Sequence, residues 1–419
     1  MKKYSEIVSF LETLQIMPKT MPGLDKIKRA LVQTDWYASL DPFKIIVVAG
    51  TNGKGSTCAM LESLLIEADQ AVGFYSSPHL ISTTERIRTS GAQLSEDIFI
   101  EVFTDCEKLI KECELSHFES LTLMAGHYFF SSKWNQNLDF VIFEVGLGGT
   151  YDATNAFPHA YSVITPLGLD HTAILGNTLA EVAQNKFGII QAGNVVIHQG
   201  FSNSLMPLKK DVEEETNSKW YEVPVAQCRV AKNSNEPKYF VKTIWGEAAL
   251  ALPGERAAQN AMTALYTFEK LGFSPLLYLD ALADTNWPGR MQKISWPNIT
   301  CPVYLSGDHN PDGIISLLKI LKDFSWHTLH VIVGIGVDKD ADEMLEELSE
   351  LPNMNLYLTA TPFKGLKLNE YPQKYLFQST DRNADVIEIL NTIDCAPNDL
   401  VLVTGSLYLV GKVLKNLKT

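Results

Sequence analysis

The chain has 419 residues, of which 46% are hydrophobic and 20% charged, proportions typical of a globular enzyme rather than a disordered chain. Its formal net charge of -14 argues against a nucleic acid partner, because phosphate backbones are normally bound by clustered basic surfaces. The six cysteines are scattered without metal-ligand spacing, which predicts reduced thiols. The sequence shows no signal peptide and no run of 18 apolar residues, so we expect no membrane contact and a cytoplasmic location.

The first predicted elements surround a glycine-rich segment. Apolar residues recur at helical spacing over residues 4–14, which predicts an amphipathic helix. The run KIIVVAG at 44–50 is typical of a buried strand, and LESLLIEA at 61–68 has a helical pattern. The intervening GTNGKGST, residues 50–57, is therefore expected at a strand-to-helix turn.

Further strands and helices alternate along the chain. DFVIFEVG at 139–146 and AYSVIT at 160–165 are apolar runs, each followed by a polar loop and a helical stretch. This alternation predicts an α/β fold with a parallel sheet covered by helices on both faces. The more polar stretch from about 200 to 245 is predicted to form a meander or a small antiparallel piece.

A domain boundary is expected after the segment 284–298, which is rich in Pro, Gly and Trp and follows a predicted helix at about 255–273. Beyond it, four apolar runs alternate with helical segments and predict a compact α/β unit. We therefore expect two domains, residues 1–295 and 296–419.

The turn at 50–57 has the features of a phosphate-binding loop. Backbone N–H groups and a helix N-terminus there can bind phosphates, whereas the alternative is a tight turn without a ligand. Lys54 is placed to pair with the outer phosphates, and Ser56 or Thr57 to reach a magnesium ion. The spacing departs from the common motif because Gly55 separates the lysine from the hydroxyls. The candidate ATP-binding residues of this loop are Thr51, Asn52, Gly53, Lys54, Gly55, Ser56 and Thr57.

Two polar residues follow strands of the same predicted sheet. Glu144 ends one strand, and His171 follows the next. Ligands of α/β sheets collect at the carboxyl ends of strands, so Glu144 is placed to hold magnesium beside the phosphates. Each residue also has a structural alternative, a cap for Glu144 and a satisfied structural histidine for His171.

The motifs of the chain, taken in order, resemble the dihydrofolate synthase and folylpolyglutamate synthase family of the Mur ligase superfamily. The motifs are VAGTNGKGST, YSSPHL with ERI, EVGLGG with YDATN, LDH with LGNT, the lysine of AQNKFGII, WPGR, HNP and VTGSLYLVG. The upstream MPGLDKIKRAL also resembles a family segment. The resemblance implies an N-terminal P-loop ATPase domain of the Mur ligase central-domain type and a C-terminal Rossmann-like α/β domain.

The resemblance also implies a reaction, in which ATP phosphorylates a carboxylate and the amine of L-glutamate attacks the acyl phosphate. The acid would be dihydropteroate, a reduced folate or both. In the family, one magnesium ion is held by residues that match Ser77, Glu144 and His171. Lys186 matches a lysine that is carbamylated and supports a second magnesium ion. The alternative is an unmodified lysine, because Asn185 and Phe187 depart from the usual surroundings.

The substrate contacts implied by the resemblance fall into two sets. Phe118 could stack on a flat pterin ring, although an aromatic residue at this place is more often part of a core. Arg290 could bridge phosphates, the alternative being a linker salt bridge. The candidate pterin-side residues are Ser116, His117, Phe118, Glu119, Tyr151, Asp152 and Ala153. The remaining candidate ATP contacts are Asn260, Arg290, Asp308 and His309.

The sequence departs from the family pattern at three places, two of them on its nucleotide side. The expected aspartate is Ser306, with Asp308 two positions later. The usual Gly-x-His-Gln reads Gly254 to Ala257, so that Arg256 stands in place of the histidine, and an expected asparagine is Pro166. We expect activity with altered nucleotide affinity.

Other functions remain open at this point. A Mur-type ligase acting on a UDP-linked sugar acid would share the loop, the lysine and the reaction. A nucleotide-dependent switch would not need Lys186, and an inactive homologue would keep only the fold. The expected partners are small molecules, namely ATP, L-glutamate and the pterin acid, and the family resemblance implies a monomer.

Overall fold

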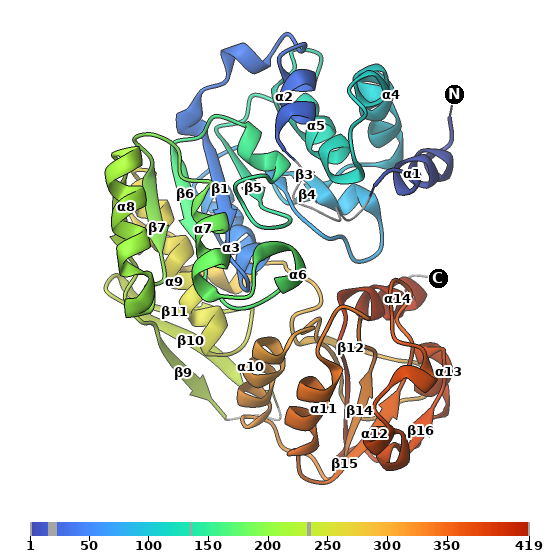
Figure 1. Cartoon of the computed structure of the whole chain (residues 1–419). Coiled ribbons are helices and arrows are strands. Elements are labelled where there is room, and N and C mark those ends of the chain that lie inside the picture. The colour runs from blue at the N-terminus through green and yellow to red at the C-terminus, as the bar shows by residue number, and fades with distance from the viewer. Residues whose placement is uncertain (1, 16–22, 135, 233–235, 418–419) are drawn as a thin grey trace. The chain divides into compact units, whose positions relative to one another are not determined.

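The chain divides into two compact units (Figure 1). The computed structural model describes residues 2–15, 23–134, 136–232 and 236–417. The first unit contains residues 1–227, 241–248 and 259–286, and the second contains 228–240, 249–258 and 287–419. The second unit thus includes two short segments that precede residue 287, and the boundary at residue 295 stays a prediction. Two residues of the upstream family segment, Met21 and Pro22, lie outside the described residues.

The first unit is built on an eight-stranded sheet with the order β4-β3-β2-β5-β1-β6-β7-β8. Its strands are β1 (Ile45–Ala49), β2 (Val72–Tyr75), β3 (Ile87–Thr89), β4 (Ala92–Gln93), β5 (Phe140–Glu144), β6 (Tyr161–Ile164), β7 (Val195–His198) and β8 (Lys219–Glu222). Strands β2, β5, β1, β6, β7 and β8 are parallel, whereas β3 and β4 add an antiparallel edge. The three strands predicted from the sequence are confirmed as the neighbours β5, β1 and β6.

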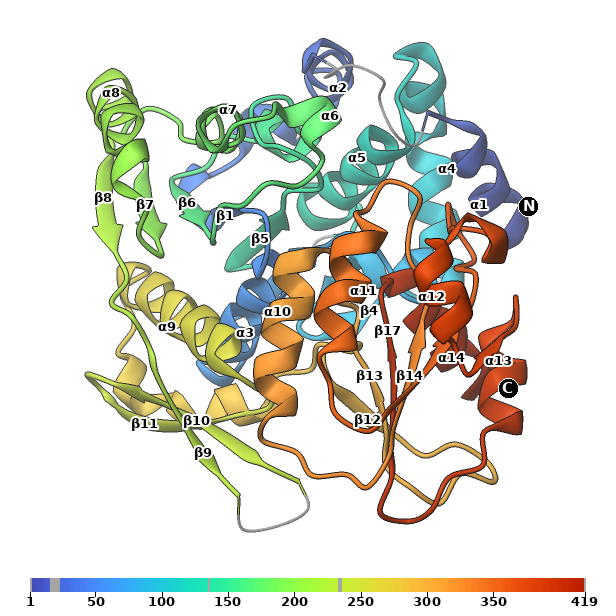
Figure 2. The same ribbon diagram turned by 60° about the horizontal axis from the view of Figure 1, so that its bottom comes forward.

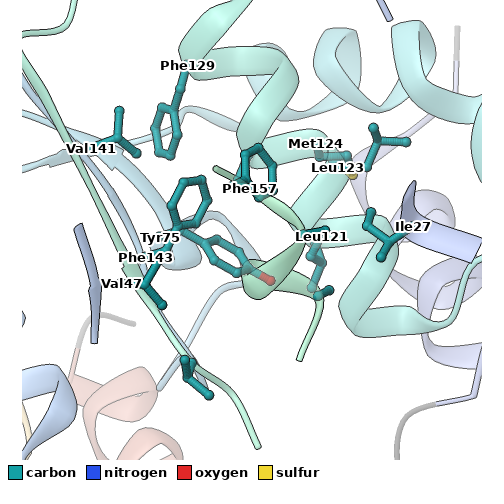
Figure 3. Close-up of a cluster of buried hydrophobic side chains, with 14 of the residues drawn as sticks. Ile27, Val47, Tyr75, Leu121, Leu123, Met124, Phe129, Val141, Phe143 and Phe157 are labelled. Carbon is teal, nitrogen blue, oxygen red and sulfur yellow. The ribbon is translucent and has the colours of Figure 1, made fainter. Parts of the chain in front are cut away.

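Helices cover both faces of this sheet, as predicted. The helices between the N-terminus and β8 are α1 (Tyr4–Thr13), α2 (Asp25–Leu31), α3 (Lys54–Glu67), α4 (Glu96–Glu112), α5 (His117–Phe130), α6 (Thr172–Leu175), α7 (Leu179–Phe187) and α8 (Met206–Thr216). Helix α3 packs against β1, β2 and β5. Strand side chains alternate between faces, and Val47 and Phe143 join a buried cluster with Leu121 and Met124 of α5 (Figure 3).

The expectation of an antiparallel piece over 200–245 is wrong for its first half. Residues 206–216 form α8, and β8 pairs in parallel with β7. The ion pairs of Lys209 with Glu213 and Lys210 with Glu214, each at i,i+4 spacing, favour the helix. The second half does form a small sheet of sequential strands, β9 (Gln227–Ala231), β10 (Lys238–Thr243) and β11 (Gly246–Leu250).

The second unit has the predicted alternation of strands and helices. Its sheet order is β12-β13-β17-β14-β15-β16, with β12 antiparallel to β13 and the other pairs parallel. The strands are β12 (Gln292–Ile294), β13 (Val303–Leu305), β14 (Leu329–Val333), β15 (Met354–Leu358), β16 (Asp381–Arg382) and β17 (Leu400–Thr404). The helices are α10 (Pro311–Leu321), α11 (Ala341–Ser349), α12 (Gln373–Gln378), α13 (Val386–Thr392) and α14 (Leu407–Leu417), and α10 lies beside α11 (Figure 2).

Helix α9 (Glu255–Lys270) contains residues of both units. Short 3-10 helices complete the chain: η1 (Tyr37–Ser39), η2 (Pro42–Lys44), η3 (Thr83–Arg86), η4 (Ala153–Ala156), η5 (Asn203–Leu205), η6 (Pro275–Leu277), η7 (Leu279–Asp284) and η8 (Leu368–Glu370). Within the described ranges, no helix combines the length and apolar character that crossing a bilayer requires. All six cysteines are free thiols, as expected.

Candidate active site

The glycine-rich loop connects β1 to α3, as predicted. Gly53 has φ +88° at the start of α3, and a Cβ atom there would lie 2.6 Å from Oδ1 of Asn260. Both the backbone conformation and the contact therefore require glycine. The Lys54 ammonium stays within the loop, donating to the carbonyl oxygens of Gly50 at 3.0 Å and Thr51 at 3.2 Å.

The loop is tied to the segment that follows β6. Oγ1 of Thr51 donates to the carbonyl oxygen of Gly168 at 2.9 Å and accepts from the N–H of Gly168 at 3.0 Å. At the start of α3, Thr57 is 1% exposed, and its Oγ1 has no hydrogen-bond partner among the described residues. A buried hydroxyl without a partner fits a loop that receives a polar ligand or a cation.

Two of the three candidate magnesium ligands contact each other. Glu144 ends β5, is 4% exposed, and accepts a 3.1 Å hydrogen bond from the backbone N–H of Ser77. His171 has φ +51° at the start of α6, and its backbone N–H donates to Oδ1 of Asp170 at 2.8 Å. A hydroxyl, a carboxylate and an imidazole are suitable donors for a divalent ion.

In the described part of the chain, no three His, Cys, Asp or Glu side chains form a metal-binding group. The candidate triad contains only two residues of these types, with the Ser77 hydroxyl as its third donor.

Lys186 reaches the glycine-rich loop from α7. Its side chain is buried, and Nζ donates to the carbonyl oxygen of Gly50 at 2.8 Å. Burial, and then the nearby ammonium of Lys54, lower the pKa of Lys186 to about 7, although Asp170 and Asp152 act in the opposite direction. A substantial fraction of this lysine is therefore neutral near neutral pH, which is the form that can react as a nucleophile.

The candidate pterin-side residues have different surroundings. Ser116 and Glu119 form a capping box at the start of α5, with the Ser116 hydroxyl donating to Oε2 of Glu119 at 2.6 Å. Burial, and then the positive charge of Arg86, lower the pKa of His117 to about 4. The ring of Phe118 fills the space beside Gly146, where an added Cβ atom would approach it to 2.7 Å.

Asp152 organises the glycine loop that follows β5. Its Oδ2 accepts from the N–H groups of Gly146 and Leu147 at 3.0 Å, and its Oδ1 accepts from the Thr154 hydroxyl at 2.6 Å. Burial raises the pKa of Asp152. Ala153 is buried beside it, whereas Tyr151 is 44% exposed.

The candidate nucleotide contacts are divided between the units. Asn260 belongs to the first unit, where Nε2 of Gln199 donates to its Oδ1 at 3.2 Å. Arg290, Asp308 and His309 belong to the second. His309 Nδ1 lies 3.0 Å from the carbonyl oxygen of Gly307.

Two departures from the family pattern, at residue 256 and at residues 306–308, lie close together in the second unit, in the segment that follows β13. The Ser306 hydroxyl donates to Oδ2 of Asp308 at 2.6 Å, and Nη1 of Arg256 lies 4.0 Å from Oδ1 of the same carboxylate. An added Cβ atom at Gly307 would lie 3.4 Å from Nη1 of Arg290.

Two residues near the candidate pterin-side residues, namely Arg86 and His79, were not singled out from the sequence. Nε of Arg86 donates to Nδ1 of His79 at 2.9 Å. Burial, and then the charge of Arg86, lower the pKa of His79 to about 3. Both residues lie inside the motifs YSSPHL and ERI, so the motifs themselves were the available signal.

A glycine-rich strand-to-helix loop, a carboxylate at the end of the neighbouring strand β5 and a buried lysine of α7 beside the loop are the arrangement expected of a P-loop enzyme, and comparisons with known proteins specify its class. Residues 48–268 match the Mur ligase middle domain, and residues 289–407 match the glutamate ligase domain of Mur ligases. The protein is thus an ATP-dependent ligase that forms an amide bond.

Relatives narrow the class to a family. The chain is 30% identical to the dihydrofolate synthase/folylpolyglutamate synthase of Haemophilus influenzae over 97% of this chain and 96% of that protein. A bifunctional folylpolyglutamate synthase/dihydrofolate synthase with Mn, AMPPNP and L-glutamate bound has a TM-score of 0.82 and 29% identity, covering 100% and 99% of the chains. E. coli FolC in complex with DHPP and ADP has a TM-score of 0.83 and 27% identity, covering 100% and 98%. The chain belongs to the dihydrofolate synthase/folylpolyglutamate synthase family, whose members ligate glutamate to folates.

Proposed function

We propose that the protein joins L-glutamate to dihydropteroate, to reduced folates or to both. The γ-phosphoryl group of ATP is transferred to an oxygen of the acid's carboxylate, which gives an acyl phosphate and ADP. The glutamate amine then attacks the carbonyl carbon, so that a C–N bond forms, the C–O bond to phosphate breaks and the amine loses a proton. Phosphorylation is needed because a free carboxylate resists attack by an amine.

The observation that carries the proposal is the contact between Lys186 and the phosphate loop. Nζ of Lys186 lies 2.8 Å from the carbonyl oxygen of Gly50, and Lys54 donates to the same oxygen at 3.0 Å. Two lysines so close together repel each other, and modification of one relieves the repulsion. We propose that Lys186 is carbamylated, because its lowered pKa of about 7 makes the neutral amine available to carbon dioxide.

We propose that Ser77, Glu144 and His171 hold one magnesium ion and that the Lys186 carbamate supports a second. When bound, these ions would neutralise the charge of the phosphoryl group in transfer. Lys54 contributes a positive charge at the same place, and the loop N–H groups bind the phosphates. The buried Glu144 is held toward Ser77 by its hydrogen bond, which orients the carboxylate in advance.

The acceptor is proposed to lie along β2 and α5. The partly exposed ring of Phe118 lies 5.7 Å from the fully buried ring of Tyr75 and is the candidate surface for a pterin. His117, Asp152 and Ala153 lie on the segments that border this surface. We propose that Asn260, Arg290, Asp308 and His309 contact the nucleotide, that the protein acts as a monomer on small molecules without a nucleic acid partner, and that it works in the cytoplasm.

The test is ADP release with magnesium, ATP and L-glutamate, comparing 7,8-dihydropteroate with tetrahydrofolate. Turnover with dihydropteroate alone assigns a dihydrofolate synthase, and turnover with both acids a bifunctional enzyme. The Mur-type alternative predicts ADP release only with UDP-muramoyl acids. Turnover with UDP-muramoyl acids and silence with both pterin acids would refute the proposal.

A further inference from the structure

Arg86 is a buried cation whose described partners carry no charge. It is 7% exposed at the end of η3. Its guanidinium donates to Nδ1 of His79 and interacts with the hydroxyl of Tyr75. Because Nδ1 accepts a hydrogen bond, that nitrogen carries no proton and His79 contributes no charge. A buried guanidinium without an anion is costly in free energy.

Three carboxylates in the described surroundings of Arg86 have other partners. Glu62 pairs with Arg88, two residues along the chain from Arg86. Glu85 accepts from the backbone N–H groups of residues 80–82 at 2.8–2.9 Å. Asp152, which acts electrostatically on the Tyr75 hydroxyl, is held by the glycine loop. The charge of Arg86 is therefore available for an external anion.

Arg86 is close both to the segment that carries Ser77 and to the start of α5, where Phe118 lies. Its carbonyl oxygen accepts from the N–H of Ser76 at 2.9 Å, which places its backbone beside Ser77. On the other side, its charge acts on His117, the neighbour of Phe118 in α5. An acid bound with its ring at Phe118 and its carboxylate at Ser77 would therefore have the charge of Arg86 in its surroundings.

We propose that Arg86 binds the carboxylate of the pterin acid, an inference that rests on the proposed function. A guanidinium offers paired N–H donors that match the two oxygens of a carboxylate. Arg86 thereby selects an acid over a neutral analogue and holds it next to Ser77 and Glu144, where phosphorylation takes place.

The test compares the affinities of 7,8-dihydropteroate and its carboxamide, measured by titration calorimetry with magnesium and a non-hydrolysable ATP analogue. The wild type is expected to bind the acid about 10- to 100-fold more tightly than the amide. Arg86→Met should reduce the affinity for the acid to that for the amide and leave the affinity for the amide unchanged. Arg86→Lys should retain part of the preference.

Two further variants complete the test. Arg88→Lys keeps a cation beside Glu62 and should retain the full preference. Arg86→Gln can still donate to His79 and serves as the neutral variant if Arg86→Met does not fold, as judged by circular dichroism.

Three outcomes would overturn the proposal in distinguishable ways. An unchanged acid-to-amide ratio in the neutral variant refutes the role of Arg86. Equal binding of acid and amide by the wild type also refutes that role but leaves the acceptor assignment intact. Failure of the wild type to bind either compound refutes the acceptor assignment and this inference with it.

Discussion

Nζ of Lys186 lies 2.8 Å from the carbonyl oxygen of Gly50, the first residue of the glycine-rich loop between β1 and α3. These residues are 136 positions apart in the chain, and α7 and β1 bring them together. The contact buries the amine next to Lys54, and burial and this neighbouring charge together lower its pKa to about 7. The chemistry of Lys186 therefore depends on pH within the physiological range.

Carbamylation of Lys186 should increase as pH rises. A lysine with a lowered pKa is mostly an ammonium below about pH 7 and mostly a neutral amine above it, and only the amine adds to carbon dioxide. With dissolved carbon dioxide held constant, the 13C NMR signal of a carbamate should be weak at pH 6 and strong at pH 8. Lys186→Arg is the control and should give no such signal, whereas a wild-type signal absent at pH 8 contradicts the proposal.

The proposed carbamate of Lys186 also predicts how a variant at this residue affects activity. Lys186→Ala should lose ADP release, because the anion proposed to support a second magnesium ion would be missing. Added short carboxylates such as acetate should restore part of the turnover at millimolar concentrations. Full activity of Lys186→Ala without any addition would show that neither the amine nor a carbamate is needed.

Glu144→Ala and Lys54→Ala should each reduce ADP release by more than about a hundredfold without unfolding the protein. Glu144 is buried at the end of β5 beside Ser77, and Lys54 lies within the phosphate loop. Glu214→Ala in α8 is the matched control, since its side chain is 68% exposed and pairs only with Lys210 in the described ion pairs. Thermal melts separate a loss of fold from a loss of function, and normal turnover in either site variant would reject the site.

Gly53→Ala should weaken ATP binding and lower the melting temperature. The added Cβ atom would lie 2.6 Å from Oδ1 of Asn260 at a backbone φ of +88°. Gly193→Ala isolates the backbone contribution, because Gly193 has φ +76° and nothing within 4 Å of an added Cβ atom. The left-handed conformation alone costs about 1 kcal/mol, so Gly53→Ala should destabilise more than this control. Equal melting temperatures and an unchanged KM for ATP would contradict the role of the contact.

The sequence could predict those parts of the site whose contacts join residues close together in the chain. The position of the glycine-rich loop was predictable because a strand, a turn and a helix are encoded within about 25 consecutive residues. Ser116 and Glu119 carry the local capping signature S-x-x-E, and the structure joins them in that way. In α8, the i,i+4 charge pairs were an available helix signal that the polar composition concealed. The bond from Arg86 to His79 depends on how η3 folds back on the segment after β2, which no local pattern specifies.

The two nucleotide-side departures should depend on each other. Arg256 occupies the position where the family pattern predicts a histidine, and Asp308 lies two positions after Ser306, where the pattern predicts an aspartate. Nη1 of Arg256 lies 4.0 Å from Oδ1 of Asp308. The Ser306 hydroxyl fixes the other carboxylate oxygen at 2.6 Å, so Asp308 is oriented from two sides. If Arg256 acts on ATP partly by orienting Asp308, then removing both residues should cost less than the sum of the two single losses.

A double-mutant cycle on the KM for ATP measures this dependence. Arg256→Ala and Asp308→Ala should each raise KM, and the double variant should fall short of the product of the two effects by about fivefold, equivalent to about 1 kcal/mol of coupling. Glu255 and Lys319 provide the control cycle, since their side chains lie 3.7 Å apart but are 76% and 61% exposed. That pair should show no coupling because solvent screens it. If the two increases in KM simply multiply, each residue acts on the nucleotide independently, and Arg256 does not act by orienting Asp308.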